Sequence, residues 1–289
     1  MPIVDNAVIM AAGTSSRFAP LSYEMPKALI PVKGEVLIER QIRQLKEAGV
    51  PEIYLVTGYK AEMFAYLEEK CGVHLIHNPD YLTRNNNASI HVVRDILKNS
   101  YICSADNYFS ENPFEREVSE CYYSAVYADG PTKEWCMDCD EDGTIRKVQV
   151  GGADAWYMLG HTFWDETFSR TFLSILEAEY DLPETADLLW ESIYINHIDE
   201  LKMKIRRYND DVVFEFDTLD ELREFDTSYV EDTRSPILKS ICADFGCSEG
   251  DLSRLTAYKD SNNAAAGFTF VYNGDTYAYA YEEQKVRRM

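Results

Sequence analysis

Hydrophobic runs and amphipathic stretches alternate along the first half of the chain. Short apolar runs of the kind found in strands buried on both faces occupy Ala7–Met10, Glu52–Thr57 and Tyr101–Ala105. Between the first two runs, Val36–Ala48 repeats apolar positions at helical spacing, and only Gln41 interrupts the stripe. The alternation of strands and helices predicts an α/β fold with a doubly wound, mostly parallel sheet.

Weaker patterns continue this order toward the middle of the chain. Further strands are predicted at Val73–His77, Tyr122–Ala128, Thr144–Val150 and Val212–Asp217. Further helices are predicted at Ala61–Lys70, Ser89–Leu97, within Phe163–Glu179, and at Thr185–Ile195 and Leu219–Phe225.

The pattern changes near residue 230. Ser235–Phe245 has the spacing of a helix, and Phe268–Tyr281 that of a β-hairpin turning at Asn273-Gly274. We therefore predict one domain at residues 1–230 and a small α+β appendage at residues 231–289, which is too short to be expected to fold by itself.

Composition narrows the classes of function. The chain of 289 residues is 46% hydrophobic and carries a formal charge of −22. That charge argues against non-specific binding to nucleic acid or to an anionic membrane, whereas it suits a cationic co-substrate. No apolar run reaches about 18 residues and no signal peptide is recognisable, so the expected location is the cytoplasm.

The seven cysteines are expected to be free thiols, because their number is odd and the chain has no leader. The one CxxC, Cys136 to Cys139, lies in a strand pattern that points its two side chains to opposite faces. A second CxxC that would complete a zinc site is missing, so neither a metal site nor a redox role is predicted there.

The segment after the first strand, AAGTSSRFAPLSYEMPK, is too long and too apolar for an ordinary connection. Its turn, Ala11-Ala12-Gly13, would let a ligand approach the backbone closely at the carboxyl end of a strand, where open α/β sheets bind ligands. Neither the dinucleotide fingerprint nor the P-loop pattern matches it. By residue type alone, a ligand loop and a solvated loop with an ordinary Arg17 and Lys27 are equally supported.

The spacing within this loop resembles the signature G-x-G-x-R-x-x-P-x(5)-P-K of nucleotidylyltransferases. The matching residues are Gly13, Arg17, Pro20, Pro26 and Lys27, and Ser15 replaces the second glycine. The resemblance implies a Rossmann-like nucleotidyltransferase fold and two catalytic cations. Arg17 would grip the phosphates of a nucleoside triphosphate, and Lys27 would stabilise charge on the α-phosphate.

Two carboxylate groups follow apolar strands later in the chain. Asp106 comes directly after Tyr101–Ala105, and VVFEFD places Glu215 and Asp217 on one face of a strand. Either could be an ordinary strand-end turn. Together with the loop signature, however, they resemble the metal carboxylates of the same family and predict Mg²⁺, which prefers carboxylate and phosphate oxygens.

The order of shorter motifs is similar to that of the bacterial CTP:phosphocholine cytidylyltransferases over about residues 5–228. These motifs are AAG, VTGYK, N-N-x-x-S, ADNY, KEW, FWD, ADLLW and E-F-D. The resemblance implies nucleotide-binding residues Ala11, Ala12, Gly13, Thr14, Ser15, Ser16, Asn86 and Ser89. It implies choline-binding residues Trp135, Asp187 and Trp190.

Aromatic faces with a counter-charge recognise a trimethylammonium group, which forms no hydrogen bonds of its own. Trp135 and Trp190 would supply the faces and Asp187 the charge; core filling is the alternative for either tryptophan. The family pattern has an aromatic at Leu189, and fewer rings would suit phosphoethanolamine or 2-aminoethylphosphonate. Phosphocholine is the predicted acceptor.

The implied reaction is attack by the phosphate oxygen of phosphocholine on the α-phosphate of CTP, with release of pyrophosphate. A sugar-1-phosphate nucleotidylyltransferase would share the loop and the carboxylates but would need hydroxyl-reading residues at Trp135 and Trp190. A non-catalytic nucleotide-binding protein would have no need of Arg17, Lys27 and the carboxylates together.

The C-terminal segment LTAYKDSNNAAAGFTFVYNGDTYAYAY faintly resembles the first hairpin of bacterial choline kinases, although the turn Asp260–Asn263 departs from it. The chain ends before any kinase catalytic residues. We expect the segment to pack on the transferase or to pair two subunits as a homodimer, and we expect its deletion to leave the chemistry intact.

Overall fold

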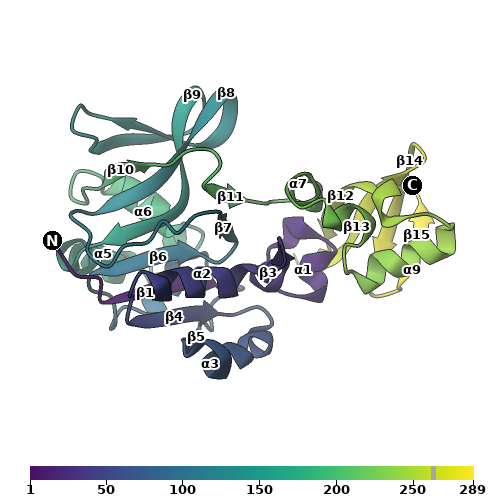
Figure 1. Ribbon diagram of the computed structural model, residues 1–289, viewed down its shortest axis with the longest axis horizontal. Coiled ribbons are helices and arrows are strands. Elements are labelled where there is room, and N and C mark those ends of the chain that lie inside the picture. Colours follow the sequence, from purple (N-terminus) through teal and green to yellow (C-terminus); the bar gives the residue numbers. More distant parts are fainter. Residues whose placement is uncertain (262–264) are drawn as a thin grey trace. The chain divides into compact units, whose positions relative to one another are not determined.

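Two compact units divide the chain in this computed structural model, which describes residues 1–261 and 265–289 (Figure 1). Unit 1 comprises Met1–Gly13 and Val36–Glu215, and unit 2 comprises Thr14–Glu35 and Phe216–Met289. The division predicted from the sequence at residue 230 assigned the loop after the first strand to the larger domain, whereas compactness places that loop with the C-terminal part.

Unit 1 is built on a seven-stranded sheet in the order β10-β8-β9-β6-β1-β4-β5. Its strands are β1 (Asn6–Ala11), β4 (Glu52–Thr57), β5 (His74–His77), β6 (Ser100–Ser104), β8 (Tyr122–Cys139), β9 (Ile145–Trp164) and β10 (Lys204–Arg207). The central strand β1 is parallel to β4 and β6, β5 is parallel to β4, and β10 is parallel to β8. Only β9 runs antiparallel to its neighbours in this sheet. The predicted doubly wound, mostly parallel α/β sheet is thus confirmed.

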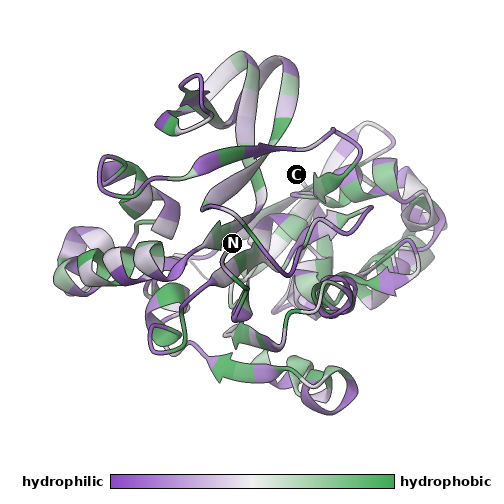
Figure 2. Cartoon of the chain, turned by 60° about the vertical axis from the view of Figure 1, so that its left-hand side comes forward, coloured by the Kyte–Doolittle hydropathy of each residue, from purple (hydrophilic) through white to green (hydrophobic). Residues whose placement is uncertain are grey.

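Helices accompany these strands, and a short ladder lies beside the sheet. The helices are α2 (Leu37–Glu47), η3 (Ala61–Phe64), α3 (Tyr66–Cys71), α4 (Asn87–Val92), α5 (Glu166–Glu179), η4 (Pro183–Thr185) and α6 (Trp190–Asn196). The ladder pairs β7 (Asn107–Phe109) with β11 (Val213–Glu215). Figure 2 shows helices banded in green and purple, as expected of helices with one apolar and one polar side.

The hairpin of β8 and β9 is much longer than predicted. The sequence predicts a strand to end at Ala128 and a helix within Phe163–Glu179, but β8 reaches Cys139 and β9 extends through Trp164. Helix α5 begins at Glu166, because the carboxylate of Asp165 accepts a hydrogen bond from the backbone N–H of Phe168. Irregular pairing along the hairpin hides its period of two, so the sequence predicted only the first part of each strand, Tyr122–Ala128 in β8 and Thr144–Val150 at the start of β9.

The core of unit 1 joins the central strands to α5 and α6. Val8, Val56 and Ile102 are fully buried in the same cluster as Phe172 of α5 and Trp190 of α6. Burial of each such side chain contributes about 1.5–3 kcal/mol, so this cluster is what holds α6 against the sheet.

Unit 2 combines the loop after β1 with the C-terminal elements. The loop carries η1 (Ser16–Phe18), α1 (Leu21–Glu24), η2 (Lys27–Leu29), β2 (Pro31–Val32) and, at its end, β3 (Glu35–Val36). The C-terminal part carries α7 (Leu219–Phe225), α8 (Ser228–Glu231), α9 (Pro236–Phe245), η5 (Glu249–Asp251), β12 (Ser253–Lys259), β13 (Ala265–Tyr272), β14 (Asp275–Ala280) and β15 (Lys285–Arg288).

Strands β12 to β15 form an antiparallel four-stranded sheet in chain order. The predicted hairpin is β13–β14, and its turn residues Asn273 (φ 49°) and Gly274 (φ 84°) both have the positive φ that a tight hairpin turn requires. Helix α9 matches its prediction and is capped by Ser235, whereas β12 and β15 were not predicted. Asn262 and Asn263, part of the turn compared with choline kinases, lie outside the described residues.

No helix within residues 1–261 and 265–289 is long and apolar enough to cross a membrane. The seven cysteines are all free thiols, as predicted.

Candidate active site

The backbone of the predicted nucleotide turn is held at the carboxyl end of β1. The backbone N–H of Ala105, after β6, donates to the carbonyl of Met10 at 3.2 Å, and that of Tyr59, after β4, donates to the carbonyl of Ala12 at 3.0 Å. Gly58 permits this approach, because a Cβ there would lie 2.8 Å from the Ala12 carbonyl oxygen. The turn is therefore fixed by the ends of both strands that flank β1.

The predicted metal carboxylates Asp106 and Glu215 lie next to each other in the backbone register. Asp106 follows β6, and the next residue, Asn107, pairs directly with Glu215 across the β7–β11 ladder. Two carboxylates 109 positions apart in the sequence are thus brought to adjacent positions in unit 1.

Two glutamines of α2 hold the backbone around Asp106, and the sequence analysis assigned them no role. The side-chain amide of Gln41 donates to the carbonyls of Ser104 (2.8 Å) and Asn107 (3.0 Å), one on each side of Asp106. Gln44 donates to the carbonyl of Phe109 at 3.1 Å. Both glutamines are buried, and the polar residue that interrupts the apolar stripe of the helix was the signal that could have found Gln41.

The donor set of this place fits a hard divalent cation. Asp106 and Glu215 offer carboxylate oxygens, the ligands that Mg²⁺ prefers. Within the described part of the chain, no group of three or more His, Cys, Asp and Glu side chains is arranged so that it could hold a metal ion. The third predicted ligand, Asp217, belongs to unit 2.

Within unit 2, Asp217 forms an ion pair with Arg17, the predicted phosphate-gripping residue. The guanidinium Nη1 and the carboxylate Oδ2 lie 2.5 Å apart, and their side chains are 74% and 36% exposed. An ion pair with this exposure contributes roughly 0–1 kcal/mol. A phosphate or a cation could therefore replace either partner at little cost in free energy.

The rest of the loop contains the other predicted cation. Lys27 is buried, begins η2, and its ammonium group lies 5.6 Å from the ring centroid of Phe18. Ser15 has φ 46°, a left-handed conformation that favours glycine, which accounts for the glycine at this place in the family signature. Thr14 and Ser16 flank it at the start of η1.

The asparagines predicted near the nucleotide are bonded to the segment that leads into α6. Asn86 accepts a hydrogen bond from the backbone N–H of Trp190 at 2.7 Å and donates to the Glu191 carboxylate at 3.1 Å. The hydroxyl of Ser89 is buried and accepts from the amide of Asn78 at 3.2 Å. In this structure Asn86 and Ser89 thus organise the protein around the predicted site.

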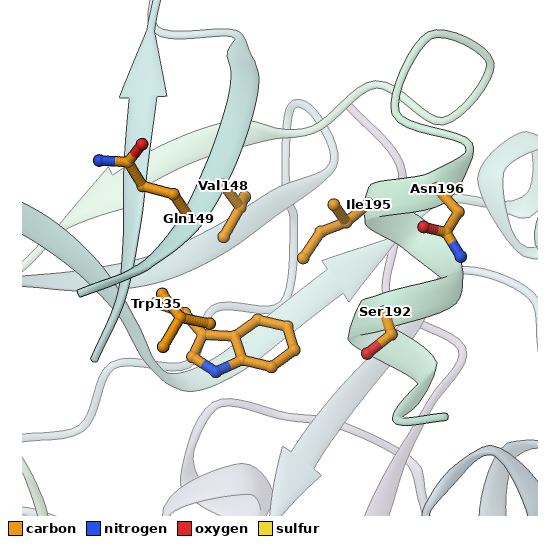
Figure 3. A pocket seen from close by; sticks show the side chains of 7 residues that line it. Trp135, Val148, Gln149, Ser192, Ile195 and Asn196 are labelled. Carbon is orange, nitrogen blue, oxygen red and sulfur yellow. The ribbon is translucent and has the colours of Figure 1, made fainter. Parts of the chain in front are cut away.

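A pocket with one aromatic wall lies between the long hairpin and α6 (Figure 3). The indole ring of Trp135 extends from β8 toward Ser192 and Ile195 of α6 (Figure 3). The cavity measures ≈ 220 Å³, and its other lining residues are Val148, Gln149, Val150 and Asn196. It is apolar enough and large enough for a small alkylammonium group.

The other two predicted choline residues do not line this pocket. Trp190 is 1% exposed, and its ring stacks on Tyr123 with the centroids 5.8 Å apart and meets Trp164 edge-on at 5.0 Å. Asp187 is exposed, and its main-chain carbonyl accepts a hydrogen bond from the side chain of Asn85 at 3.1 Å. Of the three residues, the structure brings only Trp135 to the pocket wall.

Glu191 is a carboxylate that the sequence analysis did not single out. Its two oxygens accept hydrogen bonds from Asn86 (3.1 Å) and from the Tyr123 hydroxyl (3.3 Å), so both are oriented. Burial raises the pKa of Glu191 to about 7. Nothing in its sequence context distinguishes it from a surface glutamate, because the residues that bury it come from distant parts of the chain.

Comparisons with known proteins agree with this geometry. Residues 7–122 match the MobA-like NTP transferase domain. The choline-phosphate cytidylyltransferase of Streptococcus pneumoniae is 33% identical over 76% of this chain and 96% of its own length. The 2-aminoethylphosphonate cytidylyltransferase of Lancefieldella rimae is 37% identical over 80% of this chain and 95% of its own length.

The solved structure of the Streptococcus pneumoniae CTP:phosphocholine cytidylyltransferase superposes with a TM-score of 0.74 at 34% identity, covering 77% of this chain and 97% of that one. A putative glucose-1-phosphate thymidylyltransferase from Bacillus anthracis shares the fold with a TM-score of 0.64 at 15% identity, over 78% of this chain and 95% of that one. This chain therefore belongs to the nucleotidyltransferase family that includes the choline-phosphate and 2-aminoethylphosphonate cytidylyltransferases, and it is an enzyme of that family.

Proposed function

We propose that this enzyme transfers CMP from CTP to a small alkylamine that carries a phosphate or phosphonate group, with release of pyrophosphate. The observation that carries the proposal is the match to two cytidylyltransferases over at least 95% of their length. Phosphocholine is the acceptor that the sequence motifs favour. The Trp135 pocket supports it, because an apolar pocket with an aromatic wall suits a methylated ammonium group.

We consider 2-aminoethylphosphonate as a second acceptor because of Glu191, which directly precedes the pocket residue Ser192 in the chain. An ionised carboxylate accepts hydrogen bonds from a primary ammonium group, whereas a trimethylammonium group has no N–H to donate. Each oxygen of Glu191 accepts a hydrogen bond from a protein side chain, and a carboxylate oxygen can accept more than one. The relative from Lancefieldella rimae, named for this acceptor, supports the same alternative.

The proposed mechanism needs no general base, because the attacking phosphate or phosphonate oxygen is already anionic. Catalysis then consists of positioning the two substrates and of neutralising charge on the transferred phosphoryl group. We assign that neutralisation to Lys27 and Arg17, and we assign the nucleotide contact to the backbone of Ala11 to Gly13 with the hydroxyls of Thr14, Ser15 and Ser16.

For the cation, we propose Mg²⁺ held by Asp106 and Glu215, with Asp217 as a further ligand. When bound, Mg²⁺ would supply positive charge to the polyphosphate. Gln41 would hold the Asp106 backbone in place through its two hydrogen bonds. The cytoplasmic location and the homodimer stay predictions.

A pyrophosphate-release assay tests the proposal directly. The purified enzyme is offered CTP, UTP, ATP or GTP, each crossed with phosphocholine, phosphoethanolamine, 2-aminoethylphosphonate and glucose-1-phosphate. Turnover with CTP and one of the amine acceptors is expected. Turnover with glucose-1-phosphate alone would contradict the proposal and support the sugar-1-phosphate alternative.

A further inference from the structure

The C-terminal part of the chain has no role in the proposed reaction, yet it forms one compact unit with the signature loop. Unit 2 contains Thr14–Glu35, with both predicted catalytic cations, together with Phe216–Met289. Only residues up to about 228 resemble the cytidylyltransferase motifs, so most of what accompanies the loop comes from outside the recognised enzyme.

Glu24, within the loop signature, interacts with the start of the C-terminal helix α9. Its Oε1 accepts hydrogen bonds from the hydroxyl of Ser235 and from the backbone N–H of Ile237, both at 3.0 Å. Ser235 is itself the N-cap of α9 and accepts from the N–H of Leu238 at 3.1 Å. The first turn of a helix leaves backbone N–H groups without partners and favours negative charge, so the Glu24 carboxylate serves as a second cap.

Three further contacts join the loop to the C-terminal elements. Tyr23 stacks on Tyr281, which follows β14, with the ring centroids 3.6 Å apart and the planes 4° from parallel. Tyr229 of α8 donates a hydrogen bond from its hydroxyl to the carbonyl of Pro31. In addition, η1, which contains Arg17, lies beside β12.

These contacts fix the part of the loop that connects the two predicted catalytic cations. The Pro20–Lys27 stretch separates Arg17 from Lys27, and Tyr23 and Glu24 lie in its middle, where α9 and Tyr281 hold them. We propose that the C-terminal appendage is a positioning element for the signature loop, and that Glu24 and Tyr281 set the geometry in which Arg17 and Lys27 meet the triphosphate. The inference rests on the proposed function, and it replaces the expectation that deleting the appendage leaves the chemistry intact.

Two variants of the full-length enzyme test the proposal: Glu24→Gln, which removes the charge at the start of α9, and Tyr281→Ala, which removes the stacking partner of Tyr23. The matched controls are Glu231→Gln, an exposed glutamate of α8, and Tyr272→Ala, a tyrosine of the same sheet that contacts Phe245. The measurements are kcat and the two KM values in the pyrophosphate-release assay, and hydrogen exchange of peptides covering residues 14–35.

Each test variant is expected to raise the KM for CTP or lower kcat by about tenfold. That is the size of effect expected from losing charge-assisted hydrogen bonds in Glu24→Gln and a stacked aromatic pair in Tyr281→Ala. Amide exchange in residues 14–35 should become faster, while the KM for the amine acceptor stays within about twofold. The controls should match the wild type in all four measurements. If one variant fails to fold, the other still tests the proposal, since each removes a different contact.

Unchanged CTP kinetics and unchanged exchange in both test variants would overturn the inference. Failure of the proposed function gives a different result. In that case the wild type transfers no CMP to any amine acceptor, while the exchange measurements still report whether the appendage holds the loop.

Discussion

Replacing Trp190 with alanine distinguishes a core residue from an acceptor-binding residue. The sequence motif places Trp135 and Trp190 together as aromatic walls for choline. In the structure Trp190 is 1% exposed and packs against Tyr123, Trp164 and Phe172. We therefore expect Trp190→Ala to act first on the stability of unit 1.

The magnitude follows from the buried surface. A buried tryptophan removes about 150–250 Å² from water, which at about 25 cal/mol per Å² corresponds to about 4–6 kcal/mol. Among the described residues the indole N–H of Trp190 has no hydrogen-bond partner. A buried donor left unpaired costs about 1–3 kcal/mol, so its removal offsets part of the loss. The expected net effect of Trp190→Ala is about 3 kcal/mol, at the low end of the about 3–5 kcal/mol usual for such truncations.

Urea unfolding followed by circular dichroism measures this difference. Trp190→Phe keeps most of the ring area and removes the unpaired donor, so it should cost about 1 kcal/mol or less. Trp135→Ala, at the half-exposed pocket wall, should raise the KM for the amine acceptor by about tenfold, as expected for a lost cation–π contact, with a much smaller effect on unfolding. The reasoning would be refuted if Trp190→Ala unfolded like the wild type and raised only the acceptor KM.

Three further predictions concern the charged groups. Lys27→Ala should lower kcat by about 10²–10³-fold in the pyrophosphate-release assay, as expected for a lost charge stabiliser, and an unchanged kcat would remove Lys27 from the mechanism. Asp106→Asn should abolish turnover, and added Mg²⁺ should not restore it. Full activity of this variant at saturating Mg²⁺ would exclude Asp106 as an essential ligand. The pKa of Glu191 is raised from 4.5 to about 7, so the stability it contributes is fully present below pH 4.5 and is lost as the pH rises through 7. Relative to the wild type, the free energy of unfolding of Glu191→Gln should therefore rise between pH 5 and pH 8, by on the order of 1–2 kcal/mol as measured by urea unfolding. The exposed control Glu184→Gln should show no such pH dependence.

Local patterns along the sequence predicted most elements of the fold. Glu52–Thr57 and Leu219–Phe225 were predicted with the bounds the structure shows, because each is one continuous period of apolar residues with clear ends. The Asn273-Gly274 turn was found for a similar reason, since few residue pairs adopt positive φ at both positions. Strands β7, β10, β12 and β15 were missed because short or edge strands carry little periodicity.

The loop from Gly13 to Lys27 could be predicted as a candidate site from the sequence, since its residue types and their spacing are a local property of the chain. The carboxylates Asp106 and Glu215 were predicted to belong to the same site only through the family resemblance. Asp106 and Glu215 become neighbours only through the register of β7 and β11, and no periodicity within either segment encodes that register.

By itself, the sequence determined the α/β class, the signature loop and the identity of the charged residues. Only the tertiary structure decided that Trp190 belongs to the core, that Glu191 lies between Asn86 and Tyr123, and that the signature loop forms one unit with the C-terminal helix and sheet. The physical reason is the same in each case. Burial and hydrogen-bond partners depend on which distant segments pack together, and the pattern of one segment carries no information about the segment that covers it.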